Sequence, residues 1–147
     1  MSDGKKTVIV IDEAHTIEDM KIFEELRLLL NFQENNRFLL TLLLMGQPEL
    51  KAKIESNKQF LQRIAIQYNL EGLNNAETGN YITHRISIAG GSVQFTPQAL
   101  RYIFEQSGGI PRRINQISDM SLFTGFSKQA LAITEEVAKE AVESLVH

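Results

Sequence analysis

The segment TVIVIDEAH, residues 7–15, decides how the chain is interpreted. Four apolar residues in succession, at 8–11, lead directly into Asp12 and Glu13. A short continuous apolar run is typical of a strand in a parallel sheet covered on both faces, and ligands of open α/β folds bind where such strands end. Asp12 can hold a magnesium ion, and Glu13 can orient and deprotonate a water molecule. A solvated acidic loop is the alternative, but the apolar run before the carboxylates favours the functional interpretation.

Composition and charge are those of a soluble globular protein. The 147 residues are 43% apolar and 22% charged, and the formal net charge of −3 provides no global field that would recruit nucleic acid or anionic membrane. The absence of cysteine excludes disulfides and thiolate zinc sites. His15, His84 and His147 share no metal-ligand spacing. The most apolar run, FLLTLLLM at 38–45, is far shorter than the ~20 residues of a membrane-spanning helix, so it is predicted to be a buried strand.

The first half of the chain alternates predicted strands and helices, which implies a parallel α/β sheet. After the first strand we expect a helix at about 18–31, a turn at 33–37 (QENNR), the strand at 38–45, a helix from Pro48 to about Arg63, and a less buried strand at 65–73 (AIQYNLEGL). The helix at 18–31 carries apolar residues at helical spacing: Phe23, Leu26, Leu29 and Leu30.

From residue 74 onward the pattern predicts helices only. Proline just inside a helix start and glycine at its end are typical of helix caps. The expected helices run from the NN pair to Gly90, from Thr96–Pro97 to Gly108, from Pro111 onward, and from Thr134 to the end. We therefore predict an α/β region at 1–73 and a small all-α region at 74–147.

Two further polar residues follow predicted elements of the α/β region. Gln47 stands at the tip of the second strand, where its amide could hydrogen-bond a terminal phosphate or an attacking water; a simple turn shaped by Gly46 and Pro48 is an equal alternative. Arg63 ends a helix, where it could stabilise the helix dipole or reach a phosphate on a neighbouring subunit.

Arg112 and Arg113 lie in the first turn of a predicted helix, in SGGIPRRIN. Cations at a helix N-terminus oppose the dipole, so this pair is expected to find an anion, either a carboxylate or a phosphate. The letters DEAH also suggest a helicase, but the next strand ends in LLLMGQPEL where such a helicase should carry a Ser-Ala-Thr strand end. His15 is therefore expected to lie behind the site or at the surface, without a coupling role.

Taken in order, these segments resemble the AAA+ ATPases, and more narrowly the ExeA/GspA and MshM group associated with general secretion and type IV (MSHA) pilus biogenesis. VIVIDEAH is similar to the Walker B strand, LLLMGQPEL to the sensor 1 segment, LQRI to the arginine-finger region and SGGIPRRIN to the sensor 2 helix. The likeness covers nearly the whole chain. It implies a P-loop NTPase α/β core, followed by a small all-α lid.

The resemblance implies a role for each matched residue. Asp12 would help to coordinate Mg²⁺, Glu13 would be the catalytic base, and Gln47 would occupy the sensor 1 position, where many AAA+ proteins carry Asn. Arg63 would act in trans on a neighbour's nucleotide, and Arg112 would be the sensor 2 arginine, with Arg113 as the alternative. ATP and Mg²⁺ would be the cofactors of the intact protein.

One motif of the family is absent from the sequence. A phosphate-binding loop reads G-x-x-x-x-G-K-[ST]; the segment GKKT at 4–7 lacks the first glycine and leads into a strand. The chain is therefore expected to be the C-terminal part of a truncated module, inactive alone, with phosphate-binding residues upstream of Met1. In the family fold the missing strand lies between the second and third strands. We thus expect dimerisation through the sheet, direct pairing of those two strands, or poor solution behaviour.

Two functions remain open at this point. The first is a cytoplasmic, homo-oligomeric ATPase, or the cytoplasmic part of an inner-membrane-associated one, that couples ATP binding and hydrolysis to assembly of secretion or pilus machinery. The second is a non-catalytic or DNA-associated helper of the transposition or replication type. The intact carboxylate pair favours the first function, and the acidic charge disfavours direct nucleic-acid binding. No direct membrane contact is expected of this segment.

Overall fold

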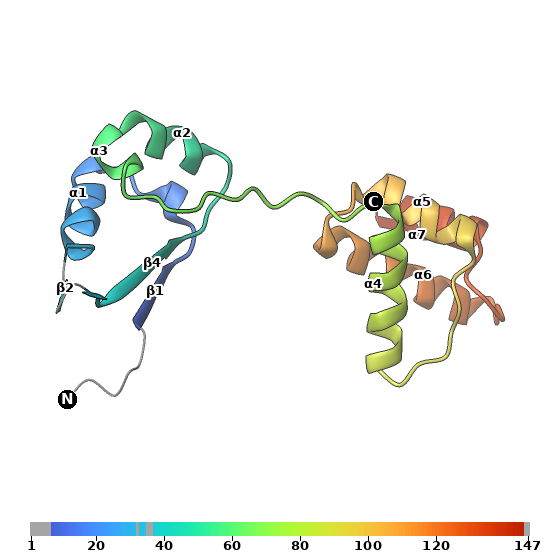
Figure 1. Ribbon diagram of the computed structural model, residues 1–147. Helices are drawn as coiled ribbons and strands as arrows, with labels where there is room; N and C mark the ends of the chain where they lie inside the picture. The colour runs from blue at the N-terminus through green and yellow to red at the C-terminus, as the bar shows by residue number, and fades with distance from the viewer. Residues whose placement is uncertain (1–6, 32, 35–36, 146–147) are drawn as a thin grey trace. The chain divides into compact units, whose positions relative to one another are not determined.

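The computed structural model describes residues 7–31, 33–34 and 37–145, and it divides into two compact units, Met1–Tyr68 and Asn69–His147 (Figure 1). The first is an α/β unit and the second is a helical unit. Among the described residues, no helix has the length and apolar character needed to cross a membrane.

The sheet of the α/β unit consists of β1 (Thr7–Ile11) and β4 (Leu40–Leu44), which pair in parallel as the sequence predicted. Their register places Ile11 beside Leu44, so the two strands end together at one edge. The prediction that both faces are covered is wrong. Within the described residues of this unit, helices lie to one side of the sheet (Figure 1), and on the other face Val10 is 52% exposed and Leu43 46% exposed. Two strands provide too little surface for helices on both sides.

Helix α1 (Met20–Leu29) begins at Asp19, whose carboxylate accepts from the Lys21 amide at 2.9 Å. The helix predicted at about 18–31 is therefore confirmed, and of its apolar residues Phe23 and Leu26 are buried whereas Leu29 is exposed. The single helix predicted from Pro48 to Arg63 is instead two, α2 (Glu49–Ser56) and α3 (Lys58–Leu61). Asn57 separates them because its side chain accepts from the Phe60 amide and so caps a new helix.

The core of the α/β unit lies between these helices and the inner sheet face. Phe23 and Phe60 meet edge to face with ring centroids 5.4 Å apart. The buried members of this core are Ala14, Phe23, Leu26, Leu50, Ile54 and Phe60.

The turn predicted at 33–37 includes residues 35–36, which lie outside the described residues. On either side of them, β2 (Gln33–Glu34) and β3 (Arg37–Phe38) pair antiparallel. The strand predicted at 38–45 is therefore interrupted: Phe38 closes the small hairpin, and β4 begins at Leu40. The apolar run was correctly predicted as strand, but composition alone did not show where one sheet ends and the other begins.

The third strand predicted at 65–73 does not form. These residues adopt neither helix nor strand, and Ile66, Tyr68 and Leu70 are each more than 80% exposed. The alternating pattern that suggested a strand is real, but a strand is stable only where a neighbour takes up its amide and carbonyl groups. Among the described residues β4 pairs only with β1, so direct pairing of the second and third strands, one of the three expected consequences of the missing strand, is not found. Dimerisation through the sheet and poor solution behaviour stay predictions.

The helical unit contains α4 (Asn75–Ile88), α5 (Pro97–Ser107), α6 (Pro111–Ser127) and α7 (Glu135–Leu145), close to the predicted positions. Asn74 and Glu77 form a reciprocal capping box at the start of α4, and Thr96 caps α5. The helices enclose one apolar core: Ile82, Ala99, Ile103, Ile114, Ile117, Ile133, Val137 and Ala138.

The chain that leads into the helical unit is held against the start of α6. The Leu73 amide donates to the Gly109 carbonyl at 2.8 Å. Gly109 has φ +73°, and a Cβ there would lie 2.0 Å from the Leu73 carbonyl oxygen. Only glycine permits this approach. Leu73, which was predicted to belong to the α/β region, therefore bonds to the helical unit.

Candidate functional site

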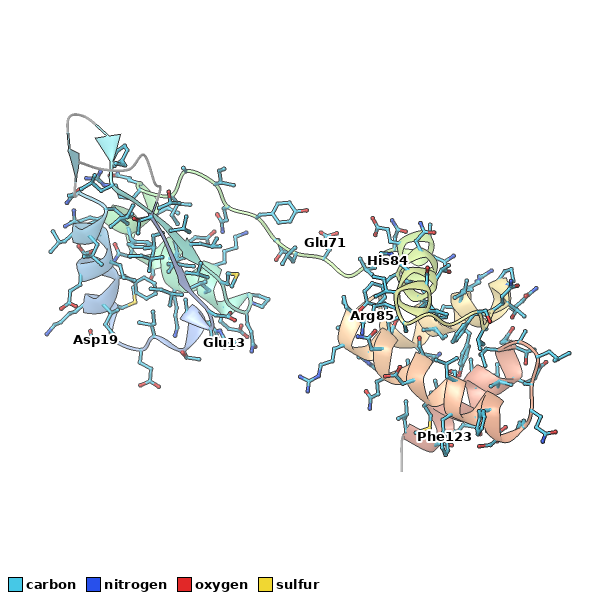
Figure 2. The ribbon with its side chains drawn as sticks, turned by 90° about the horizontal axis from the view of Figure 1, so that it is seen from below. Glu13, Asp19, Glu71, His84, Arg85 and Phe123 are labelled. Carbon is cyan, nitrogen blue, oxygen red and sulfur yellow. The ribbon has the colours of Figure 1, made fainter. Side chains whose placement is uncertain are left out.

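The Asp12–Glu13 turn follows directly from the end of β1. The Glu13 amide donates to Asp12 Oδ1 at 2.8 Å, and Glu13 itself has φ 54° and ψ 30°, a left-handed conformation that is uncommon for a residue with a side chain. Thr16 holds this conformation by donating both its amide and its hydroxyl to the Glu13 carbonyl. Both carboxylates are exposed at the end of the strand, where Figure 2 labels Glu13. The turn thus presents two acids in a fixed backbone conformation.

The end of β4 lies beside this turn. Backbone hydrogen bonds continue the β1–β4 ladder past the last strand residues. The Met45 amide donates to the Ile11 carbonyl at 2.9 Å, and the Ala14 amide donates to the Met45 carbonyl at 2.8 Å. Gln47 follows two residues later with an exposed side chain. The structure therefore brings Asp12, Glu13 and Gln47 to the same edge of the sheet, as the sequence predicted for neighbouring parallel strands.

His15 joins the two turns. Its Nδ1 accepts from the Gln47 amide at 3.3 Å, and its Nε2 lies 3.5 Å from Glu13 Oε2. The His15 side chain is only 15% exposed, so it lies behind the site and not at the surface. The Gln47 contact spans 32 residues of sequence, which no local pattern could reveal.

Two more residues at this place were not predicted from the sequence. Lys53 of α2 donates to the backbone carbonyls of His15 and Ile17, the second at 2.9 Å. Gly46 leaves room for the ring, because a Cβ there would lie 3.0 Å from the His15 amide nitrogen and 3.2 Å from its Nδ1. The glycine was correctly predicted to end the strand, but its close approach to His15 depends on the fold.

Arg63 lies in the turn after α3 with its side chain exposed. Its amide donates to the Phe60 carbonyl at 2.9 Å, and Phe60 is anchored in the core. Within the described residues, no hydrogen bond or ion pair joins Arg63 to Asp12, Glu13 or Gln47. An exposed arginine on an anchored turn is suited to reach outside its own chain, so the trans role stays a prediction.

Arg112 and Arg113 are exposed in the first turn of α6, after Pro111. Both point out of a helix whose next residue, Ile114, is fully buried in the helical core. The predicted carboxylate partner is not found for either arginine among the described residues. Their predicted contact with a nucleotide stays a prediction.

The donor chemistry at the turn suits a magnesium ion bound together with phosphates. Mg²⁺ commonly takes one or two protein carboxylates and fills its remaining positions with water and phosphate oxygens. Asp12 provides such a carboxylate at an exposed strand end. The described residues contain no group of three or more His, Cys, Asp or Glu side chains that could hold a metal by themselves. Any ion here would therefore need oxygens from a nucleotide or solvent.

Known proteins resemble this chain in sequence and in fold. A family model described as AAA domain matches residues 1–54. General secretion pathway protein A of Aeromonas hydrophila is 38% identical over 133 residues, which cover 87% of this chain and 24% of that protein. Over most of its length the chain is thus similar to a GspA-type AAA+ protein. It spans about a quarter of the length of that relative.

Solved structures support the same fold. A point mutant of RuvB from Thermotoga maritima matches 95% of this chain and 46% of its own, with a TM-score of 0.75 and 18% identity. The structure of the same protein described as a Holliday junction branch migration motor gives a TM-score of 0.68 with 19% identity, and covers 94% of this chain and 44% of its own. At this identity the likeness concerns the fold alone: a parallel α/β part followed by a small helical part.

Proposed function

We propose that this GspA-type AAA+ chain is part of an ATPase that couples ATP binding and hydrolysis to the assembly of secretion or type IV pilus machinery. The observation that carries the proposal is the Asp12–Glu13 turn, which presents two carboxylates beside the Gln47 turn at one sheet edge. A chain with only a scaffolding role has no need of a second carboxylate in a left-handed backbone conformation.

In this proposal each residue has a distinct task. Asp12 would hold Mg²⁺, which would supply positive charge beside the phosphates. Glu13 orients the attacking water and accepts its proton, and Gln47 hydrogen-bonds that water or the terminal phosphate. These three side chains act on a nucleotide whose phosphates need a further set of backbone amides.

The arginines complete the proposed site from other directions. Arg63 extends from its anchored turn to the nucleotide of a neighbouring subunit, where its planar fork stabilises spread negative charge. Arg112 contacts the nucleotide from the helical unit, and Arg113 is the alternative. Homo-oligomerisation follows from the trans role of Arg63, and we place the protein in the cytoplasm, where ATP is abundant.

The test uses the longest polypeptide that the native gene encodes, with ATP hydrolysis and ATP binding measured separately. Glu13→Gln should lower the turnover number at least ~100-fold, because it removes the general base, and should leave ATP affinity within about twofold. Glu105→Gln, an exposed carboxylate on α5, is the matched control and should be silent. Hydrolysis by Glu13→Gln at the normal rate would refute the assignment.

A further inference from the structure

We propose that His15 is a positioning residue that sets the Glu13 carboxylate relative to the Gln47 turn; the functional half of this inference rests on the function proposed above. Two contacts carry it. Nδ1 of His15 accepts from the Gln47 amide at 3.3 Å, and Nε2 faces Glu13 Oε2 at 3.5 Å. One ring therefore touches both turns that bear the site.

The Gln47 amide fixes which ring nitrogen carries the proton. A backbone N–H only donates, so Nδ1 must be unprotonated to accept from it. The hydrogen of a neutral imidazole then resides on Nε2, the nitrogen that faces Glu13. The Gln47 amide thereby leaves the N–H of the neutral ring on the nitrogen that lies 3.5 Å from the Glu13 carboxylate.

The surroundings of the ring hold this arrangement in place. Lys53 donates to the carbonyls of His15 and Ile17, which ties α2 to the short helix after Glu13. Gly46 admits the ring, since a Cβ there would lie 3.2 Å from Nδ1. The adjoining Ala14 is buried in the core. The backbone that carries the ring is thus anchored to α2 and to the core, and the ring itself is only 15% exposed.

The position of Glu13 matters because a base must meet its water in a narrow geometry. A misplacement of about 1 Å can cost about 100-fold in rate. Glu13 is itself exposed and has several rotatable bonds, so without His15 its carboxylate would sample many directions. The His15 contact limits these directions and links them to the Gln47 turn, on the neighbouring strand.

The first test determines by NMR which nitrogen of the His15 ring carries the proton. It uses the 147-residue chain and does not depend on catalysis. A two-bond proton–nitrogen correlation spectrum should show His15 with a protonated Nε2 and an unprotonated, hydrogen-bonded Nδ1. His84, which is exposed on α4, is the internal reference, and His84→Asn identifies its signals. Protonation of His15 at Nδ1 in the neutral ring would overturn the proposal.

The second test separates the two contacts by substitution. In His15→Asn the amide oxygen can replace Nδ1 as acceptor, whereas the longer His15→Gln places its amide nearer to the Nε2 position. Hydrogen exchange at the Gln47 amide should be about tenfold faster in His15→Ala and His15→Gln than in the wild type, and close to normal in His15→Asn. Equal exchange in all three variants would overturn the Gln47 contact. Lys53→Met, with the ring intact, should retain the tautomer.

The third test addresses function in the native gene product. His15→Asn and His15→Gln should each lower kcat about tenfold with an unchanged KM for ATP, because each keeps only one of the two contacts. A wild-type kcat in both variants, with Glu13→Gln inactive, would overturn the positioning role. If the unmodified protein hydrolyses no ATP, the proposed function fails, and the spectrum and the Gln47 exchange still decide whether His15 joins the two turns.

Discussion

The two units of this chain differ in how completely they bury their apolar side chains and pair their backbone amide and carbonyl groups. The helical unit encloses a core in which Ile103 and Ile114 are fully buried, and its helices are capped by their own sequence. The α/β unit has a two-stranded sheet with one open face and is followed by an extended apolar segment without a strand partner among the described residues. Helices satisfy their backbone internally, whereas strands depend on neighbours. The candidate functional residues Asp12, Glu13 and Gln47 therefore lie in the unit whose sheet is less fully paired and covered.

The largest effect should come from opening the helical core. Ile114→Ala should lower the free energy of unfolding of the helical unit by about 2–5 kcal/mol, because it leaves a cavity at a fully buried site. Urea unfolding, followed by NMR signals from each unit, measures this loss. Ile110→Ala, a half-exposed position four residues earlier, should cost within about 0.5 kcal/mol. Equal costs at the two positions would contradict the described core.

A smaller loss of stability should show that the chain before α4 is held against the start of α6. Gly109→Ala should cost about 1–3 kcal/mol beyond Gly90→Ala, because both glycines have φ +73° but only Gly109 would bring a Cβ against Leu73. Gly90 has nothing within 4 Å of that position, so it reports the backbone cost alone. The same unfolding measurement compares the two variants. If they behave alike, the chain before α4 is not held against α6.

The sheet should tolerate polar substitution on one face and not on the other. Val10→Thr should change stability by about 0.5 kcal/mol or less, since that side chain is already half in water. Ile11→Thr should cost about 1–3 kcal/mol, because Ile11 packs against the core and a hydroxyl there loses its solvation. Urea midpoints of the α/β signals test the pair. A large loss in Val10→Thr would mean that the outer face is covered.

The smallest effect concerns acid stability of the α/β unit. Hydrogen bonds from Arg27 and then Asn57 hold the pKa of the Glu24 carboxyl below its ordinary value. A depressed folded-state pKa stabilises the fold above the unfolded-state pKa, and this stabilisation is lost as the pH falls through the folded value. Glu24→Gln should therefore flatten the decline of the α/β midpoint in acid. Glu25→Gln, exposed on the same helix, should leave the decline unchanged.

The difference between the two units also explains which parts of the fold could be predicted from the sequence. The helical unit was predicted closely because its signals are local: the Asn74 capping box, Pro97 and Pro111 at helix starts, and Gly108 at a helix end. The α/β unit was predicted less well because strands depend on distant partners. The apolar alternation at 65–73 was recognised, but whether it forms a strand depends on a neighbour that the pattern itself does not contain.

The candidate site shows the same division. Asp12, Glu13 and Gln47 were found from their positions at strand ends, because parallel pairing brings such ends together. His15 was expected behind the site or at the surface, but its contact with the Gln47 amide was not predicted, because the two residues are 32 positions apart in the sequence. Arg63 and Arg112 lie at the helix end and helix start that the sequence indicated, whereas their contacts with a nucleotide stay predictions.

Residue-resolved hydrogen exchange of the dilute 147-residue chain tests the central difference between the units most directly. The account predicts the slowest exchange in α5, α6 and α7, intermediate exchange in β1 and β4, and exchange close to that of an unstructured peptide at residues 65–71. Protection of residues 65–71 equal to that of β1 and β4 would mean that this segment is a paired strand, and would contradict the account.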